Sequence, residues 1–285
     1  MHDRIRSGST TMDDPAGRRV KILKDEQAMQ IARDEAVTIG QVYVHALMLG
    51  IYPYRYLRNR ESISLEEQLL LAQARVAIVG AGGLGGQVIL LLARVGVGNL
   101  TVIDYDRFDE TNLNRQALSN MEMLGKFKSE AAIAIIGNIN PGINILARPQ
   151  RVDATNAEEI LAGSDLVVDA LDNVGDRFVI EKATQDLGIP LVHGALAGFE
   201  GQLMTIFPDD PGLQDLYGTG YSEKDKTKSA EAILGVPTLT PAFIATLQAM
   251  EVLKIILNRP GIFRNTMLHA DLENGTLEKF SFERP

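Results

Sequence analysis

Between residues 64 and 257 the apolar positions of the chain switch repeatedly between two periods. Short continuous apolar runs are typical of strands buried inside a parallel sheet, and they cover 75–79, 100–103, 143–147, 166–168 and 190–192. Apolar residues at helical spacing lie beside or between these runs, over 64–74, 84–95, 128–138, 157–161 and 174–187. Strands that alternate with helices form right-handed βαβ units, so the predicted fold class is α/β with a doubly wound, mostly parallel, Rossmann-like sheet.

After the fifth strand the alternation stops. Residues 202–207 have the pattern of a further strand, and 241–257 that of a long, apolar helix. Residues 268–282 predict an antiparallel hairpin, because the Asn-Gly pair at 274–275 is a strong two-residue turn signal. The stretch 208–237 is rich in Gly, Asp, Lys and Pro, which predicts a mobile crossover-type loop. We therefore expect antiparallel strands at the C-terminal end of the sheet.

Residues 1–54 predict a polar tail followed by a helical extension. Residues 1–19 are polar and are expected to be mobile, whereas 25–50 have helical spacing that Gly40 divides into two short helices. Two helices around a glycine also occur in helix-turn-helix DNA-binding motifs. That spacing is common, however, and the segment carries little positive charge, so we do not assign it to DNA.

Composition narrows the class of protein. The chain has 285 residues, of which 45% are hydrophobic, enough for one large domain with an appendage. A net charge of −9 without a long basic block argues against nucleic acid or an anionic membrane as the main partner. No apolar run is expected to span a membrane, and the N-terminal residues MHDRIRSGST lack the apolar core of a secretory signal, so we expect a cytoplasmic protein.

The segment Gly-Ala-Gly-Gly-Leu-Gly at 80–85 follows a strand and opens a helix. Glycines at such a turn let backbone N–H groups approach a phosphate at the positive end of the helix dipole; they are Gly80, Gly82, Gly83 and Gly85. The next strand ends at Asp104, where a carboxylate accepts hydrogen bonds from ribose hydroxyls. The pattern predicts a nucleotide site, against the alternative of a glycine turn without a ligand, but does not identify the nucleotide.

Cationic and amide side chains cluster just beyond the second strand; they are Asn112, Arg115, Gln116, Lys126 and Lys128. Arginine is a rigid clamp for phosphate oxygens and lysine a mobile point charge. Any one of these cations alone is also consistent with a solvated loop charge. Together they favour a triphosphate under attack at its α-phosphate, where negative charge grows.

Asp172 follows the fourth strand of the predicted sheet, in the crevice where such sheets bind ligands. Mg²⁺ usually takes one or two protein carboxylates together with phosphate oxygens, so we assign a metal to Asp172. Asp169, in the same segment, is then a helix cap or a turn acid. His193 follows the fifth strand and can line the same crevice, although a lone histidine at a strand end is more often a packing residue.

Six segments, in this order and spacing, resemble the E1-like (ubiquitin-activating-type) adenylyltransferase family, MoeB/ThiF/HesA group. They are V-G-A-G-G-L-G, I-D-Y-D, N-L-N-R-Q, G-K-F-K, L-D-N and L-Q-A-M-E, and the match covers about residues 55–257. The resemblance implies an adenylation domain at 55–285 that uses ATP and Mg²⁺. It also implies a small ubiquitin-like sulfur-carrier protein with a Gly-Gly C-terminus as partner.

The resemblance also implies residue roles. The implied nucleotide-binding residues are Gly80, Gly82, Gly83, Gly85, Asp104, Asp106, Asn112, Arg115, Lys128 and Asn173. Asp172 would hold Mg²⁺, while Arg115 and Lys128 would stabilise charge as the carrier's carboxylate attacks the α-phosphorus. Arg58 matches the family arginine that reaches into the neighbouring subunit's site, which implies a homodimer; by sequence alone it is equally consistent with a surface charge.

The chain departs from the family pattern because it contains no cysteine. Many relatives carry two C-x-x-C pairs that bind zinc, and a cysteine in the loop before the last long helix. Here that stretch is 228–232 and contains Ser229, and the usual Lys-Pro-Lys is 126–128 with phenylalanine in the middle. We therefore expect no zinc, no thioester on this chain and a separate sulfur donor.

The predicted function is ATP-dependent adenylation of a sulfur carrier's C-terminal carboxylate, which yields an acyl-adenylate and pyrophosphate for molybdopterin- or thiamine-type cofactor synthesis. Three alternatives stay open. The same site could adenylate a peptide or a small carboxylate. A NAD-dependent oxidoreductase would explain the glycine loop and Asp104, but would leave Arg115, Lys128 and Asp172 without a role. A scaffold that kept the fold and lost turnover is the third.

Overall fold

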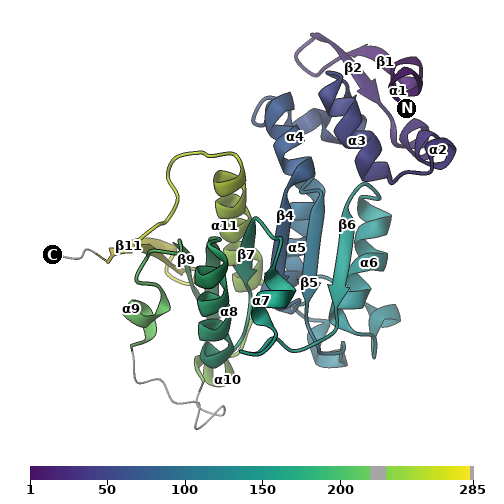
Figure 1. Ribbon diagram of the computed structural model, residues 1–285. Helices are drawn as coiled ribbons and strands as arrows, with labels where there is room; N and C mark the ends of the chain where they lie inside the picture. Colours follow the sequence, from purple (N-terminus) through teal and green to yellow (C-terminus); the bar gives the residue numbers. More distant parts are fainter. Residues whose placement is uncertain (219–228, 283–285) are drawn as a thin grey trace.

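The computed structural model describes residues 1–218 and 229–282, and these ranges contain an eight-stranded and a three-stranded sheet (Figure 1). The strand order of the large sheet is β11-β10-β9-β8-β7-β4-β5-β6. Its parallel strands are β4 (Arg75–Val79), β5 (Asn99–Ile103), β6 (Asn144–Arg148), β7 (Leu166–Asp169) and β8 (Leu191–Ala197). Its antiparallel strands are β9 (Glu200–Ile206), β10 (Thr266–Asp271) and β11 (Thr276–Ser281). The predicted α/β class, with a mostly parallel sheet and antiparallel C-terminal strands, is confirmed.

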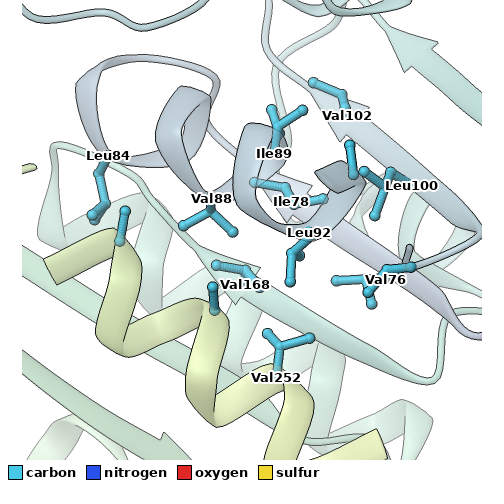
Figure 2. Packing of buried hydrophobic residues seen from close by; sticks show 14 of the residues in the cluster. Val76, Ile78, Leu84, Val88, Ile89, Leu92, Leu100, Val102, Val168 and Val252 are labelled. Carbon is cyan, nitrogen blue, oxygen red and sulfur yellow. The ribbon is translucent and has the colours of Figure 1, made fainter. Parts of the chain in front are cut away.

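Helices cover both faces of the large sheet, because alternate strand residues point to opposite sides. The helices that share the first core are α4 (Leu65–Gln73), α5 (Gly83–Val95), α6 (Lys128–Ile139) and α11 (Leu239–Ile256). The second core joins α7 (Ala157–Leu161), α8 (Val174–Leu187) and α9 (Leu213–Tyr217). Figure 2 shows Val76 and Ile78 of β4 meeting Val88 and Leu92 of α5, with Val252 of α11 beside them.

Helix α11 corrects the expectation that no apolar run is long enough to cross a membrane. By length and composition alone its 18 residues qualify. The helix nevertheless packs against α5, β8 and β9, and Ile244, Ala245 and Val252 are fully buried in the first core. It is a core helix, and its apolar character reflects that burial.

Two short helices lie within the predicted loop at 208–237. They are α9 and α10 (Ala230–Leu234), and the N-cap of α10 is Ser229, whose hydroxyl accepts a hydrogen bond from Ala232 N (3.2 Å). Part of this prediction, residues 219–228, lies outside the described residues.

Residues 1–19 are folded, so the prediction of a mobile tail was wrong. The elements of the N-terminal unit are α1 (His2–Gly8), β1 (Thr10–Asp13), β2 (Arg19–Leu23), α2 (Asp25–Glu35), α3 (Ile39–Met48), β3 (Tyr52–Pro53) and the 3₁₀ helix η1 (Tyr54–Asn59). Ile5 is fully buried among Leu23, Ala28 and Ile31, and β1 pairs antiparallel with β2. One well-placed isoleucine and a strand partner order a segment whose average composition is polar.

The N-terminal unit is docked on the large domain, at the top of the view in Figure 1. Arg55 donates to Ile139 O at the end of α6 (2.8 Å), and Asn140 Nδ2 donates to the Tyr56 hydroxyl (2.8 Å). A Cβ atom on Gly40 would lie 2.5 Å from Gly142 O, so the start of α3 is pressed against the large domain. Helix α3 contains no Lys or Arg. The helix pair therefore serves packing within the chain and offers no basic face to DNA.

Candidate active site

The glycine loop between β4 and α5 contains two kinds of glycine. Gly80 has φ +97°, and a Cβ atom there would lie 2.5 Å from Ala170 O, at the end of β7. A Cβ atom on Gly85 would lie 1.8 Å from Gly80 O. At Gly82 and Gly83 the nearest atoms are 3.7 and 3.4 Å away, so these two leave space. The first pair closes the turn against the sheet, whereas at the second pair a Cβ atom would make only ordinary van der Waals contacts, so close packing within the chain does not require glycine there.

Replacing Gly85 by alanine is expected to destabilise the fold by about 1–3 kcal/mol or more, because its methyl group would overlap Gly80 O. Gly86→Ala is the matched control on the same helix. Its added Cβ atom would meet nothing closer than 3.5 Å, and alanine favours the helix. Melting temperatures of the two variants measure the difference, and equal values would contradict the packing role of Gly85.

The start of α5 offers an anion-binding end. Gly82 is its N-cap residue, and no side chain among the described residues caps it. The first backbone N–H groups of this 13-residue helix are therefore available to oxygen atoms of a phosphate.

Asp104 lies at the end of β5, beside the glycine loop. Its carboxylate accepts hydrogen bonds from Ala81 N (2.7 Å) and Asp106 N (2.8 Å). Burial raises the pKa of Asp104, while Lys128 and the two amides oppose that rise. Asp104 thus holds the loop in place, and its remaining lone pairs suit the ribose role that the sequence predicts.

Lys128, the first residue of α6, is 7% exposed and pairs with Asp106 (Nζ to Oδ2, 3.0 Å). Its backbone N–H also donates to Asp106 O (2.8 Å). Asp106 is therefore a direct partner of Lys128, a relationship that the sequence did not predict. The pair holds the ammonium group near Asp104, where its charge opposes the rise that burial causes in the pKa of that carboxyl.

Asn112 is the last residue of the 3₁₀ helix η2 (Glu110–Asn112), and Arg115 follows this helix. A second 3₁₀ helix, η3 (Met121–Met123), comes after Arg115. Asn112 is buried and accepts a hydrogen bond from Asp109 N (3.0 Å), so it fixes the loop. Arg115 Nη1 donates to Thr111 O and to Asn114 Oδ1, both at 2.9 Å. A Cβ atom on Gly83 would lie 3.6 Å from Arg115 O, which places Arg115 beside the glycine loop.

Gln116 also reaches the glycine loop. Its side chain is buried, and its Nε2 atom would lie 3.7 Å from a Cβ atom on Gly82. Its Oε1 atom has no hydrogen-bond partner within residues 1–218 and 229–282. We predicted Gln116 as one of a polar cluster, but its place against the loop was visible only in the structure.

Asp172 and Asn173 follow β7, next to the glycine loop. Asp172 is exposed, and the one hydrogen-bond contact described for its side chain is Asn173 Nδ2 at 3.5 Å. Asn173 caps α8 by accepting from Asp176 N (2.8 Å). The Asp172 carboxylate therefore keeps lone pairs for a ligand, and hard oxygen donors are those that Mg²⁺ prefers. The described residues contain no cluster of three metal-ligating side chains.

Arg58 is exposed and lies at the end of α5 that is opposite to the glycine loop. Its neighbour Asn59 donates to Val95 O (3.3 Å), at the last residue of α5, whereas the glycine loop lies at the first. Within one chain Arg58 does not join the predicted site.

A buried polar network lies beneath Asp172. His193 is fully buried, and its Nδ1 atom lies 2.7 Å from Asp169 Oδ2, so the packing interpretation of this histidine fits the structure. Arg177 and Tyr217 complete the network (Nη1 to OH, 2.7 Å). Neither residue was predicted from the sequence: the place of Arg177 near the start of the helix that follows Asp172 is a weak signal, and nothing local marks Tyr217.

Glu181 on α8 gives the fold a pH dependence. Its side chain is buried and accepts a hydrogen bond from Leu213 N (2.6 Å), and burial raises its pKa from 4.5 to about 7. A carboxyl with a pKa raised by folding stabilises the protein below about pH 4.5, and this contribution is lost as pH rises to about 7. Glu181→Gln keeps an oxygen for Leu213 N.

We expect the unfolding free energy of the wild type to fall by about 1–3 kcal/mol relative to Glu181→Gln between pH 4.5 and 7. Denaturant unfolding at a series of pH values measures this difference, with the exposed Glu159→Gln as control. Burial also raises the pKa of Glu231 to about 7, so the unfolding free energy of Glu181→Gln should still fall with pH, but less steeply than that of the wild type. Parallel curves for wild type and Glu181→Gln would contradict the prediction.

The fold and the site together are those of a nucleotide-binding class of α/β protein: a glycine loop, the cations Arg115 and Lys128 and the exposed Asp172 follow the carboxyl ends of parallel strands. The ThiF family matches residues 56–285, and the chain belongs to this family. The predicted resemblance is therefore confirmed.

Relatives and solved structures agree with the family. The SAMP-activating enzyme E1 of Haloferax volcanii is 37% identical over 226 residues, which cover 79% of this chain and 83% of that protein. The sulfur carrier protein adenylyltransferase of Thermus thermophilus is 36% identical over 225 residues (77% and 82%). The crystal structure of E. coli MccB with ATP has 20% identity and a TM-score of 0.66, and covers 81% of this chain and 71% of that one. At that identity it supports the fold alone.

Proposed function

We propose that this chain is an ATP-dependent adenylyltransferase that joins the C-terminal carboxylate of a ubiquitin-like sulfur-carrier protein to AMP and releases pyrophosphate. The observation that carries the proposal is the place of four features at the carboxyl ends of the parallel strands: the glycine loop, the backbone of Arg115 beside it, Lys128 and the exposed Asp172. The names of the Haloferax and Thermus relatives support a sulfur carrier as the partner. A nicotinamide enzyme would leave the three charged side chains unused.

The chemistry follows from charge. A carboxylate that approaches a triphosphate meets repulsion of roughly 4 kcal/mol per pair of unit charges at about 4 Å and an effective dielectric constant near 20. The positive end of α5, Arg115 and Lys128 offset this repulsion and the charge that grows on the α-phosphate. Asp172 would hold Mg²⁺, which supplies further positive charge to the phosphate oxygens. The carrier's carboxylate is already ionised, so the step needs no general base.

The absence of cysteine limits the reaction to adenylation. The chain cannot form a thioester, and Ser229 caps α10, so its hydroxyl already serves the backbone. The acyl-adenylate would pass to a separate sulfur donor, in molybdopterin- or thiamine-type cofactor synthesis. Thiolate zinc ligands are likewise impossible, and packing of the N-terminal unit on the large domain would take the place of a zinc staple.

Carrier-dependent ATP–pyrophosphate exchange tests the proposal. The purified chain is mixed with candidate small proteins that end in Gly-Gly, with the same proteins lacking those two residues as controls. Exchange that requires the intact C-terminus supports a carrier. Exchange with short peptides alone would favour the peptide alternative, and a thermal shift with NAD but none with ATP and Mg²⁺ would refute adenylation.

We also propose a homodimer in which Arg58 enters the neighbouring subunit's site, because it is exposed and far from the glycine loop of its own chain. Arg58→Ala and Arg115→Ala should each be inactive alone. After co-refolding, mixed dimers contain one complete site, so about a quarter of the wild-type exchange rate is expected from random pairing. Failure of the two variants to complement would argue against a shared site.

A further inference from the structure

Both backbone polar groups of Leu171, the residue before Asp172, make hydrogen bonds to side chains. Leu171 N donates to Asp169 Oδ1 (3.0 Å), and Leu171 O accepts from Arg177 Nη2 (2.5 Å). The residue after Asp172 is held as well, since Asn173 caps α8. The Asp172 side chain itself is exposed. The hydrogen bonds on either side therefore fix the backbone position of Asp172 and limit the positions that its carboxylate can reach.

Arg177 connects this loop to the segment on either side of residues 219–228. Its side chain is 4% exposed, and Nη1 donates to the Tyr217 hydroxyl on α9 (2.7 Å). Nη2 lies 3.9 Å from Glu231 on α10, and Nε lies 3.7 Å from Asp169 at the end of β7. One buried guanidinium thus joins β7, the Asp172 loop, α9 and α10.

The hydrogen atoms of the network can be assigned. A carboxylate at Asp169, facing the Arg177 guanidinium, only accepts, so His193 Nδ1 carries a hydrogen atom. Burial lowers the pKa of His193, which leaves Nε2 as an acceptor for the Tyr217 hydroxyl (3.2 Å). The Tyr217 oxygen then accepts from Arg177 and from Gln202 Nε2 (2.9 Å). Each of these hydrogen bonds orients the next, so the loss of one is expected to disturb its neighbours.

We propose that Arg177 is a positioning residue for the metal site, which holds Leu171 so that Asp172 binds Mg²⁺ in one geometry. Tyr217 and Asp169 fix the guanidinium in turn. The inference rests on the proposed function for the assignment of Mg²⁺ to Asp172. Groups one shell away from a metal ligand typically change metal affinity by 10–100-fold when they are removed.

The test compares Arg177→Lys and Tyr217→Phe with Lys182→Gln, a change at an exposed position of the same helix. Arg177→Lys is expected to raise the Mg²⁺ concentration for half-maximal pyrophosphate exchange about tenfold. The rate at saturating Mg²⁺ and ATP binding without Mg²⁺ should stay close to wild type. Tyr217→Phe should act in the same direction by about threefold, and hydrogen exchange at Leu171 should accelerate in both.

An unchanged Mg²⁺ requirement in folded Arg177→Lys would overturn the inference. A lower rate at saturating Mg²⁺ with an unchanged requirement would also overturn it, because that pattern marks direct catalysis. If Arg177→Lys does not fold, Tyr217→Phe decides by the same measurements. If the wild type exchanges pyrophosphate with no carrier, the proposed function fails, and ATP titrations with and without Mg²⁺ still decide the role of Arg177.

Discussion

Carrier-dependent pyrophosphate exchange is expected to fall by about 10²–10³-fold when Arg115 is replaced by alanine, with little change in melting temperature. The backbone of Arg115 lies beside the glycine loop, which leaves its guanidinium within reach of the α-phosphate on which negative charge grows in the proposed reaction. Its present partners, Thr111 O and Asn114 Oδ1, belong to exposed residues that water can satisfy. The loss should therefore fall on catalysis and spare the fold.

Asn114→Ala is the matched control for Arg115→Ala, since it removes a partner of the same side chain without removing the charge. Arg115→Lys should recover only part of the rate, because an ammonium group lacks the planar fork that binds two phosphate oxygens. Exchange at the wild-type rate in Arg115→Ala would remove this residue from the catalytic assignment. An equal loss in Asn114→Ala would mean that loop structure, and not charge, sets the rate.

The large sheet could be predicted from the sequence because its signals are local. Continuous apolar runs mark strands such as 166–168, and the glycine loop marks a strand-to-helix turn. The N-terminal unit could not be predicted in the same way. Its order depends on Ile5 meeting Leu23 and on Arg55 reaching Ile139 O, and such long-range contacts leave no periodic trace.

The site was predictable where one residue type serves one chemistry at a strand end, as for Asp104 and Asp172. The side chains with which these site residues pair in the fold could not be predicted from the sequence. Asp106, implied as a nucleotide contact, pairs with Lys128, and Asp169, expected to be a cap or turn acid, also anchors His193. These pairs form across 22 and 24 residues of sequence, so only the fold brings them together.

The Asp106–Lys128 pair has a consequence for nucleotide binding. Lys128 is almost buried, whereas Asp106 is half-exposed, so the aspartate can turn to solvent more easily than the lysine can move. A phosphate at the start of α5 would compete with Asp106 for the ammonium group. Asp106 thus neutralises the buried ammonium group of Lys128 until a phosphate replaces it. The pairing lowers the free-energy cost of burying that charge when no ligand is bound.

Asp172→Asn is expected to lower pyrophosphate exchange by about 10³-fold at any Mg²⁺ concentration, because an amide oxygen carries no net charge to hold the cation. ATP binding without Mg²⁺ should be unchanged, since the glycine loop and the cations remain. Asp186→Asn, on the exposed face of α8, changes the net charge equally and serves as control. Removing Mg²⁺ with a chelator should abolish exchange in the wild type and in Asp186→Asn alike.

The Mg²⁺ titration separates Asp172 from Arg177. A direct ligand cannot be replaced by more metal, so the Asp172→Asn rate should stay low at saturation, whereas excess Mg²⁺ should restore Arg177→Lys. Full exchange in Asp172→Asn would move the metal to another carboxylate, and Glu231, 3.9 Å from the same guanidinium, would then be the next residue to replace. Rescue of Asp172→Asn by Mg²⁺ would instead make Asp172 an outer partner of the metal, contacting it through water.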